Sequence, residues 1–120
     1  MKELYWIGSS QDDIRRFPQT VKQAAGYALY LAQEGDKHPD AKPLKGFSGA
    51  GTLEVVIDKQ GDTYRAVYTV SFKDMVYVLH AFQKKSKRGI ATPKQEIEQI
   101  KNRLQQARTH YAKIRGTKND

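Results

Sequence analysis

Two consecutive segments in the middle of the chain alternate between apolar and polar residues, and a third is a nearly continuous apolar and aromatic run; both patterns predict strands. They cover residues 53–58, 64–72 and 75–83, and short turns at residues 59–62 and 73–74 separate them. Short turns between such segments are typical of hairpins, so the pattern predicts an antiparallel meander. The apolar run Leu4–Ile7 predicts one more strand near the start of the chain.

The segment between the first strand and the meander predicts two helices. Ser10 and Asp13 have the spacing of a capping box, so a short helix is predicted to begin there and to be interrupted by Pro18. A second helix is predicted over residues 19–33 and ends at Gly35. Its apolar stripe has helical spacing and consists of Val21, Ala24, Ala25, Ala28, Leu31 and Ala32.

The end of the chain predicts a long helix. Thr92 is predicted as its N-cap, Pro93 as its first residue, and the tail from about residue 116 to 120 is expected to fray. Apolar residues recur at spacings of three and four along it: Ile97, Ile100, Leu104, Ala107, Tyr111 and Ile114. This narrow stripe favours packing along one groove, which leaves Arg103 on the remaining surface.

These elements predict one domain over residues 1–120 with an α+β fold. We expect a small, mostly meander antiparallel sheet, with the N-terminal helical pair and the C-terminal helix packed mainly on one face. The other face would be open. Residues 36–51 are predicted to be a loop, because three glycines and two prolines interrupt them, and Leu44 and Phe47 are expected to anchor it.

Charge and cysteine content narrow the possible functions. Lys and Arg outnumber Asp and Glu by 21 to 13, which gives a net charge of +8 and favours an anionic partner such as nucleic acid or an acidic protein. The chain has no cysteine, which excludes disulfides, zinc–thiolate sites and a cysteine nucleophile. No apolar run is long enough for a membrane span or a signal peptide, so a cytoplasmic location is predicted.

The open face would carry a carboxylate next to a guanidinium. Strand alternation places Glu54 and Arg65 together on neighbouring strands, opposite the apolar set. Such a pair can serve the attack of a hydroxyl on a phosphodiester, because the carboxylate takes the proton and the guanidinium stabilises the developing charge. Lys84 and Lys85 at the end of the next strand could hold the phosphate or protonate the leaving oxygen. The alternative is a solvated cross-strand pair of little energetic value.

A basic cluster continues the last strand. It consists of Lys84, Lys85, Lys87 and Arg88, with Phe82 close by. Cations can follow the phosphates of RNA while bases stack on aromatic rings, so this cluster is a candidate RNA-binding surface. Further lysines that could extend it are Lys42, Lys45 and Lys59. The alternative is a solvated strand end that contributes only to solubility.

The three histidines do not indicate a metal site or a catalytic triad. Alternation places His80 with Val78 and Phe82, which favours a hydrogen-bonded core histidine over a catalytic one. His38 and His110 have no carboxylate or histidine at metal-ligand spacing, so no metal and no cofactor are predicted. Phosphate-binding P-loops, dinucleotide fingerprints and nucleophile elbows are also missing from the sequence.

The order of elements and two motifs resemble the RelE/ParE superfamily, specifically its phage-derived Gp49-like or HigB-like branch. The motifs are the strand Tyr64-Arg-Ala-Val-Tyr68 and the segment from His80-Ala-Phe-Gln-Lys-Lys85 to Thr92-Pro-Lys-Gln-Glu-Ile97. The resemblance covers roughly residues 3–112.

This resemblance implies a type II toxin, a small basic endoribonuclease that cuts mRNA without a metal, often on the ribosome, and so inhibits translation. Its partner would be an antitoxin, commonly a helix-turn-helix protein of the HigA-like kind. By position, Arg65 matches the arginine that contacts the scissile phosphate, and Lys85 with Lys84 matches the cation at the end of the last strand. Glu54 occupies a catalytic strand position and would act as the base.

Some positions depart from the family pattern, and a second function stays open. The strand-end position carries lysine where many active members carry arginine, and His110 and Tyr111 are late candidates for the acid. The ParE-like branch has the same fold but poisons gyrase. The alternative to a nuclease is therefore a gyrase inhibitor or an RNA- or partner-binding module.

Overall fold

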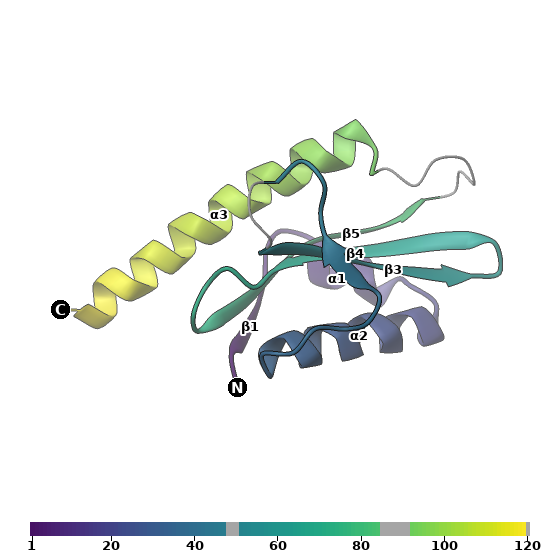
Figure 1. Cartoon of the computed structure of the whole chain (residues 1–120). Helices are drawn as coiled ribbons and strands as arrows, with labels where there is room; N and C mark the ends of the chain where they lie inside the picture. The colour runs from purple at the N-terminus through teal and green to yellow at the C-terminus, as the bar shows by residue number, and fades with distance from the viewer. Residues whose placement is uncertain (48–50, 85–91, 120) are drawn as a thin grey trace.

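A single mixed sheet lies between helices on its two sides (Figure 1). The computed structural model describes residues 1–47, 51–84 and 92–119. Its strands have the order β1-β5-β4-β3-β2 across the sheet. The elements in chain order are β1 (Glu3–Trp6), α1 (Ser10–Arg15), α2 (Gln19–Gln33), β2 (Ala41–Pro43), β3 (Thr52–Lys59), β4 (Asp62–Thr69), β5 (Met75–Lys84) and α3 (Lys94–Asn119).

The predicted meander is confirmed, because β3, β4 and β5 are consecutive antiparallel neighbours. The first strand, β1, pairs in parallel with β5 at one edge of the sheet. The prediction of a loop over residues 36–51 missed the short strand β2, which pairs with β3 at the other edge. Leu44 is buried and Phe47 partly buried behind β2, as expected of anchors.

A β-bulge interrupts the alternation of β5. Tyr68 pairs with Val78 whereas Val67 pairs with His80, so Leu79 is the extra residue. Val78 faces the core beneath α2, but Leu79 packs in the core beneath α3. Because cross-strand partners point to the same side, His80 lies on the side of Val67 and not with Val78, as alternation had predicted.

The α+β class is confirmed, but the helices do not lie mainly on one face. One core beneath α1 and α2 includes Ile14, Val21, Ala28, Val55 and Tyr68. A second core on the opposite side of the sheet lies beneath α3 and includes Val67, Tyr77, Leu79, Ile100 and Leu104. The predicted open face is therefore partly covered, because the apolar stripe of α3 packs on the apolar residues of that side of the sheet.

The helix starts differ from prediction by one or two residues. Ser9, and not Ser10, is the N-cap of α1, and its hydroxyl donates to Asp13 at 2.8 Å. Ser10 is buried and donates to the Val78 carbonyl oxygen at 3.1 Å, which ties α1 to β5. Pro18 separates α1 from α2 as predicted. On α2, Leu29 is buried where the predicted stripe had Leu31.

The last helix, α3, begins at Lys94, after Pro93 and not at it. The Pro93 carbonyl oxygen accepts the first helical bond, from the Ile97 amide at 3.0 Å. The apolar stripe is confirmed, because its central residues are buried and its two end residues partly buried. The helix continues to Asn119, into the tail that was predicted to fray from residue 116. In the described part of the chain, no helix combines the length and apolar character needed to cross a membrane.

Candidate functional site

The Glu54–Arg65 pair is buried and does not lie on an open surface. Arg65 Nη1 donates to Glu54 Oε2 at 3.0 Å, and the two residues are 3% and 5% exposed. Glu54 pairs with Val67 and Arg65 with Val56 across the β3–β4 ladder, so the two charges are diagonal neighbours on the α3 side. The prediction that they share a face is confirmed. The predicted solvent-exposed setting is wrong, because α3 and Thr92, two residues before it, lie over this side.

Thr92, at the start of the last described segment, completes the cluster. Its hydroxyl accepts from Arg65 Nη1 at 3.3 Å and donates to Glu54 Oε2 at 3.2 Å. Thr92 was predicted as the N-cap of the last helix, but its hydroxyl contacts this ion pair. From β2, the more exposed Lys42 places its Nζ 3.8 Å from Glu54 Oε1. The cluster therefore joins β2, β3, β4 and the approach to α3.

Lys84 belongs to the same side of the sheet. Its strand partner is Thr63, two residues before Arg65, and Phe82 is the partner of Arg65. The structure thus brings Glu54, Arg65 and Lys84 together on one face, close to the aromatic ring of Phe82. Of the other predicted cations at this strand end, Lys85, Lys87 and Arg88 lie outside the described residues.

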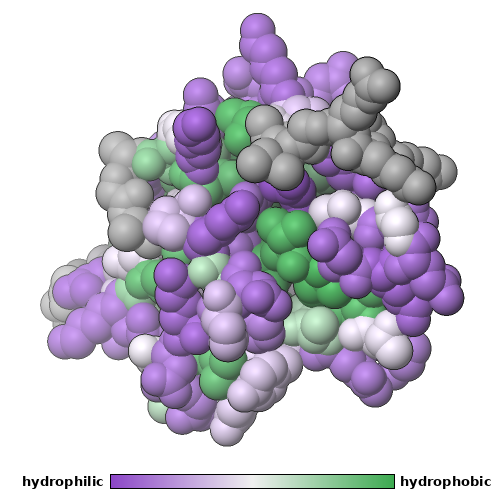
Figure 2. Space-filling view, turned by 45° about the vertical axis from the view of Figure 1, so that its right-hand side comes forward, coloured by the Kyte–Doolittle hydropathy of each residue, from purple (hydrophilic) through white to green (hydrophobic). Residues whose placement is uncertain are grey.

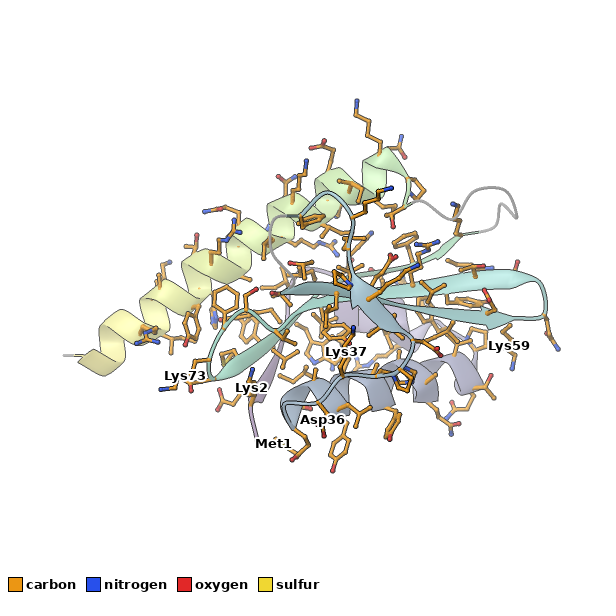
Figure 3. The ribbon with its side chains drawn as sticks, viewed as in Figure 1. Met1, Lys2, Asp36, Lys37, Lys59 and Lys73 are labelled. Atoms are coloured by element: carbon orange, nitrogen blue, oxygen red, sulfur yellow. The ribbon has the colours of Figure 1, made fainter. Side chains whose placement is uncertain are left out.

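The two remaining predicted RNA-binding lysines lie apart from each other. Lys45 is exposed in the turn after β2. Lys59 lies at the end of the β3–β4 hairpin next to α2, and its Nζ donates to Thr20 Oγ1 (Figure 3). Lys59 therefore belongs to the opposite side of the sheet, because it alternates with Ile57 and Val55 and not with Glu54.

A buried polar network next to the cluster was not predicted. His80 lies between α3 residues Glu96 and Arg103: its Nε2 is 2.7 Å from Glu96 Oε2, and its Nδ1 is 2.9 Å from Arg103 Nη1. Because a guanidinium only donates, Nδ1 accepts and the Nε2 proton points to Glu96. Arg103 also donates to the Leu79 carbonyl oxygen at 3.0 Å and to Ser9 Oγ at 3.1 Å.

Arg103 was predicted to lie on the surface, but it is 8% exposed. The sequence offered one signal, since Glu96 and Arg103 are seven residues apart and therefore lie on one side of a helix. What the sequence did not show was the bulge that turns His80 toward them. The expectation that His80 is a hydrogen-bonded core histidine is confirmed.

The late candidates for an acid lie elsewhere. His110 Nδ1 is 2.7 Å from the Tyr77 hydroxyl, and its ring contacts the ring of Tyr5 in a tilted arrangement, at 4.1 Å between centroids. Burial, together with the nearby Tyr5 and Tyr111, raises the pKa of Tyr77 to about 12. These residues form an aromatic cluster between β1, β5 and the second half of α3, apart from Glu54 and Arg65.

The surface on the side shown in Figure 2 is mainly hydrophilic, with apolar residues exposed in small areas between polar ones. A surface of this kind suits a charged ligand better than a lipid, since membrane sites expose larger contiguous apolar patches. It agrees with the excess of lysine and arginine in the sequence.

Comparison with known families identifies the chain. The model of the phage-derived Gp49-like family matches residues 12–105, most of the sequence. The chain belongs to the Gp49-like family. This match includes Glu54, Arg65, Lys84 and the first part of α3. A search of curated protein sequences found no significant match.

Solved structures show that this Gp49-like protein has a RelE-like fold. A mutant of the E. coli toxin RelE in the free state is similar with a TM-score of 0.52 and 20% identity, over 67% of this chain and 80% of that one. The RelBE2 toxin–antitoxin complex from Mycobacterium tuberculosis contains a similar chain at TM-score 0.43 and 19% identity, over 71% of this chain and 93% of that one. The predicted Gp49-like branch is confirmed by the family match, and the predicted RelE-like fold by the RelE structure.

Proposed function

We propose that this protein is the toxin of a type II toxin–antitoxin module and cleaves mRNA, on the ribosome, as a metal-independent endoribonuclease. The observation that carries the proposal is the Glu54–Arg65 pair with Lys84 on the same face of a RelE-like sheet. The Gp49-like family match and the net charge of +8 support it. A ribonuclease of this kind inhibits translation by destroying the message.

In the proposed reaction, the ribose 2′-hydroxyl attacks the adjacent phosphorus. The bond from the 2′-oxygen to phosphorus forms, the bond from phosphorus to the 5′-oxygen breaks, and the products are a 2′,3′-cyclic phosphate and a 5′-hydroxyl. Glu54 takes the 2′-hydroxyl proton, and Arg65 stabilises the charge on the phosphorane. Lys84, with Lys85, protonates the departing 5′-oxygen or holds the phosphate. No step requires a metal ion.

The burial of Arg65 adds a condition to this reaction. Its Nη1 is occupied by Glu54 and by the Thr92 hydroxyl, and the side chain is 3% exposed. A phosphate oxygen that binds Nη1 would take the place of the Thr92 hydroxyl. Binding of RNA is therefore coupled to a displacement of the chain at Thr92, just before α3.

The test is cleavage of a reporter mRNA by purified protein, with and without ribosomes. Arg65→Gln is expected to slow cleavage about 100-fold or more, because one charge-stabilising donor is lost. The matched control is Lys22→Gln, which removes one charge from α2 and is expected to leave the rate unchanged. Because the single change leaves Glu54 buried without Arg65, the folded fraction of each variant is measured by circular dichroism.

The products and the metal requirement give independent readouts. We expect ends with a 2′,3′-cyclic phosphate. In the reaction without ribosomes, which themselves need Mg²⁺, the rate is expected to be unchanged by EDTA. Cleavage by Arg65→Gln at the rate of the parent protein, or loss of ribosome-free cleavage on addition of EDTA, would contradict the proposed mechanism.

The burial of the Glu54–Arg65 pair also supports a second function, in which the protein binds a partner and cleaves no RNA. If the Glu54–Arg65 pair stays closed, it joins β3, β4 and the approach to α3 as a structural ion pair, and the protein acts as a binding module or a ParE-like gyrase inhibitor. Intact message together with altered DNA supercoiling in a cell-free extract would support this alternative. Loss of message at defined 5′ ends would exclude it.

The proposed partner is a cognate antitoxin, a helix-turn-helix protein of the HigA-like kind. Because the chain is strongly basic, we expect the docking segment of the antitoxin to be acidic.

A further inference from the structure

A pocket separate from the Glu54–Arg65 cluster opens between α3 and the end of the sheet. It has a volume of about 410 Å³. Phe47, Phe72 and Leu104 supply its apolar walls. Phe72 is fixed by ring contacts with Tyr77 and Tyr111, at 5.2 and 4.7 Å between centroids. This volume lies within the range of small-molecule sites, which is roughly 300–1,000 Å³.

Two cations stand at the rim of this pocket. Lys101 and Arg108 are both exposed, and neither forms an ion pair with another residue in the described ranges. They are seven residues apart with Leu104 between them, so they lie on one side of α3, about 10 Å apart along its axis. The sequence has no acidic residue from 99 to 119. Glu98 is one turn before Lys101, but the ion pairs of the described residues include none between these two side chains.

The pocket lies on the same side of the sheet as the proposed catalytic cluster. Thr52, which lines the pocket, precedes Glu54 by two residues on β3, and both point toward α3. Two residues along a strand correspond to about 7 Å. A ligand that extends from Glu54 along α3 therefore reaches the pocket within the length of a nucleotide.

We propose that this pocket is a nucleotide-binding subsite, in which a base of the RNA flanking the cleaved linkage stacks on Phe47. Lys101 and Arg108 then bind the phosphates on either side of that base. The inference rests on the proposed ribonuclease function and deepens it. An aromatic wall between two unneutralised cations matches a nucleotide, since bases stack on aromatic rings while cations bind the backbone.

The experiment measures binding separately from cleavage. A labelled single-stranded RNA with 2′-O-methyl groups throughout lacks the nucleophile and cannot be cut, so its dissociation constant is measured by fluorescence anisotropy. An abasic chain with the same number of phosphates is the second probe. The variants are Phe47→Ala and the pair K101Q/R108Q. The matched control is K22Q/K37Q, which removes one charge from α2 and one from the loop after it. Lys37 (Figure 3) lies there near Leu53 of the core beneath α2, on the opposite side of the sheet.

We expect Phe47→Ala to weaken binding of the base-containing RNA about tenfold and to leave the abasic probe unaffected, because one stacked base is lost. K101Q/R108Q is expected to weaken both probes and to lower the slope of log K against log salt by about 1.4, because two phosphate contacts are lost. The K22Q/K37Q control is expected to change neither probe by more than about twofold.

Equal effects of Phe47→Ala on both probes, or equal effects of the two double variants, would overturn the subsite. Loss of antitoxin binding by K101Q/R108Q with unchanged RNA binding would also overturn it, in favour of an acidic peptide as the occupant. Failure of the parent protein to bind either probe or to cleave mRNA would instead contradict the proposed function.

Discussion

Tyr68 shows how a single buried residue limits the stability of this protein. Its ring is fully enclosed in the core beneath α2, and its hydroxyl has no hydrogen-bond partner among the described residues. Burial raises the pKa of Tyr68 to about 12, because the phenolate would lose its hydration. An unsatisfied buried hydroxyl is costly, since the unfolded chain binds water there.

The substitution Tyr68→Phe is predicted to raise the free energy of unfolding at pH 7 by about 1 kcal/mol, because the unpaired hydroxyl is removed. The pKa of Tyr68 is about 12 in the folded protein and about 10 in the unfolded chain. This difference contributes stability that is fully present below pH 10 and is lost as the pH rises from about 10 to 12. The variant should therefore lose less stability than the parent protein between pH 9 and 11.

Urea unfolding at several pH values measures both effects. Tyr27→Phe is the matched control, because Tyr27 is 54% exposed and should change neither quantity. A Tyr68→Phe variant that is clearly less stable at pH 7 would show that the hydroxyl has a partner in solution.

At the scale of elements, α3 is held to the sheet by its apolar stripe and by Arg103. The guanidinium of Arg103 binds α1 through Ser9 and β5 through Leu79 and His80. Gly8 allows this contact: it has a φ of +57°, and a Cβ there would lie 2.9 Å from Arg103 Nε. The network therefore ties α3 to both α1 and β5.

Arg103→Met is predicted to lower the free energy of unfolding by about 2–4 kcal/mol, because a buried carbonyl oxygen and the His80 Nδ1 atom lose their donor. Lys101→Met is the matched control on the same helix and should lie within about 0.5 kcal/mol of the parent protein. Denaturant unfolding followed by circular dichroism measures both. Equal stability of the two variants would contradict the role assigned to Arg103.

At the scale of the whole molecule, the charge of +8 sets how partners approach. Some of the cations are engaged internally, such as Arg65 and Arg103, whereas Lys101, Arg108 and Lys45 are exposed. The exposed cations attract anionic partners at long range, and added salt shortens the range of this attraction by screening the charges.

The complex with the antitoxin is therefore predicted to weaken about tenfold or more between 50 and 500 mM salt, since charge complementarity steers and holds it. Isothermal titration calorimetry or surface plasmon resonance at several salt concentrations measures this change. An affinity that stays constant over this range would contradict an interface led by charge.

The sequence by itself determined the elements and their order, because alternation, helical spacing and turn residues act over a few positions. It placed the meander, Pro18 between two helices, the stripe of α3 and the common face of Glu54 and Arg65. The Tyr64–Tyr68 strand and the segment after His80 were enough to indicate the family that the comparison confirms.

Only the tertiary structure decided which of these residues are covered. The bulge at Leu79 shifts the alternation of β5 by one residue, so that His80 faces α3 and contacts Glu96 and Arg103 of that helix. A local pattern cannot indicate this shift, since it depends on pairing between strands. Burial of Arg65 under the approach to α3 likewise depends on how the last helix crosses the sheet, because that packing joins residues distant in sequence.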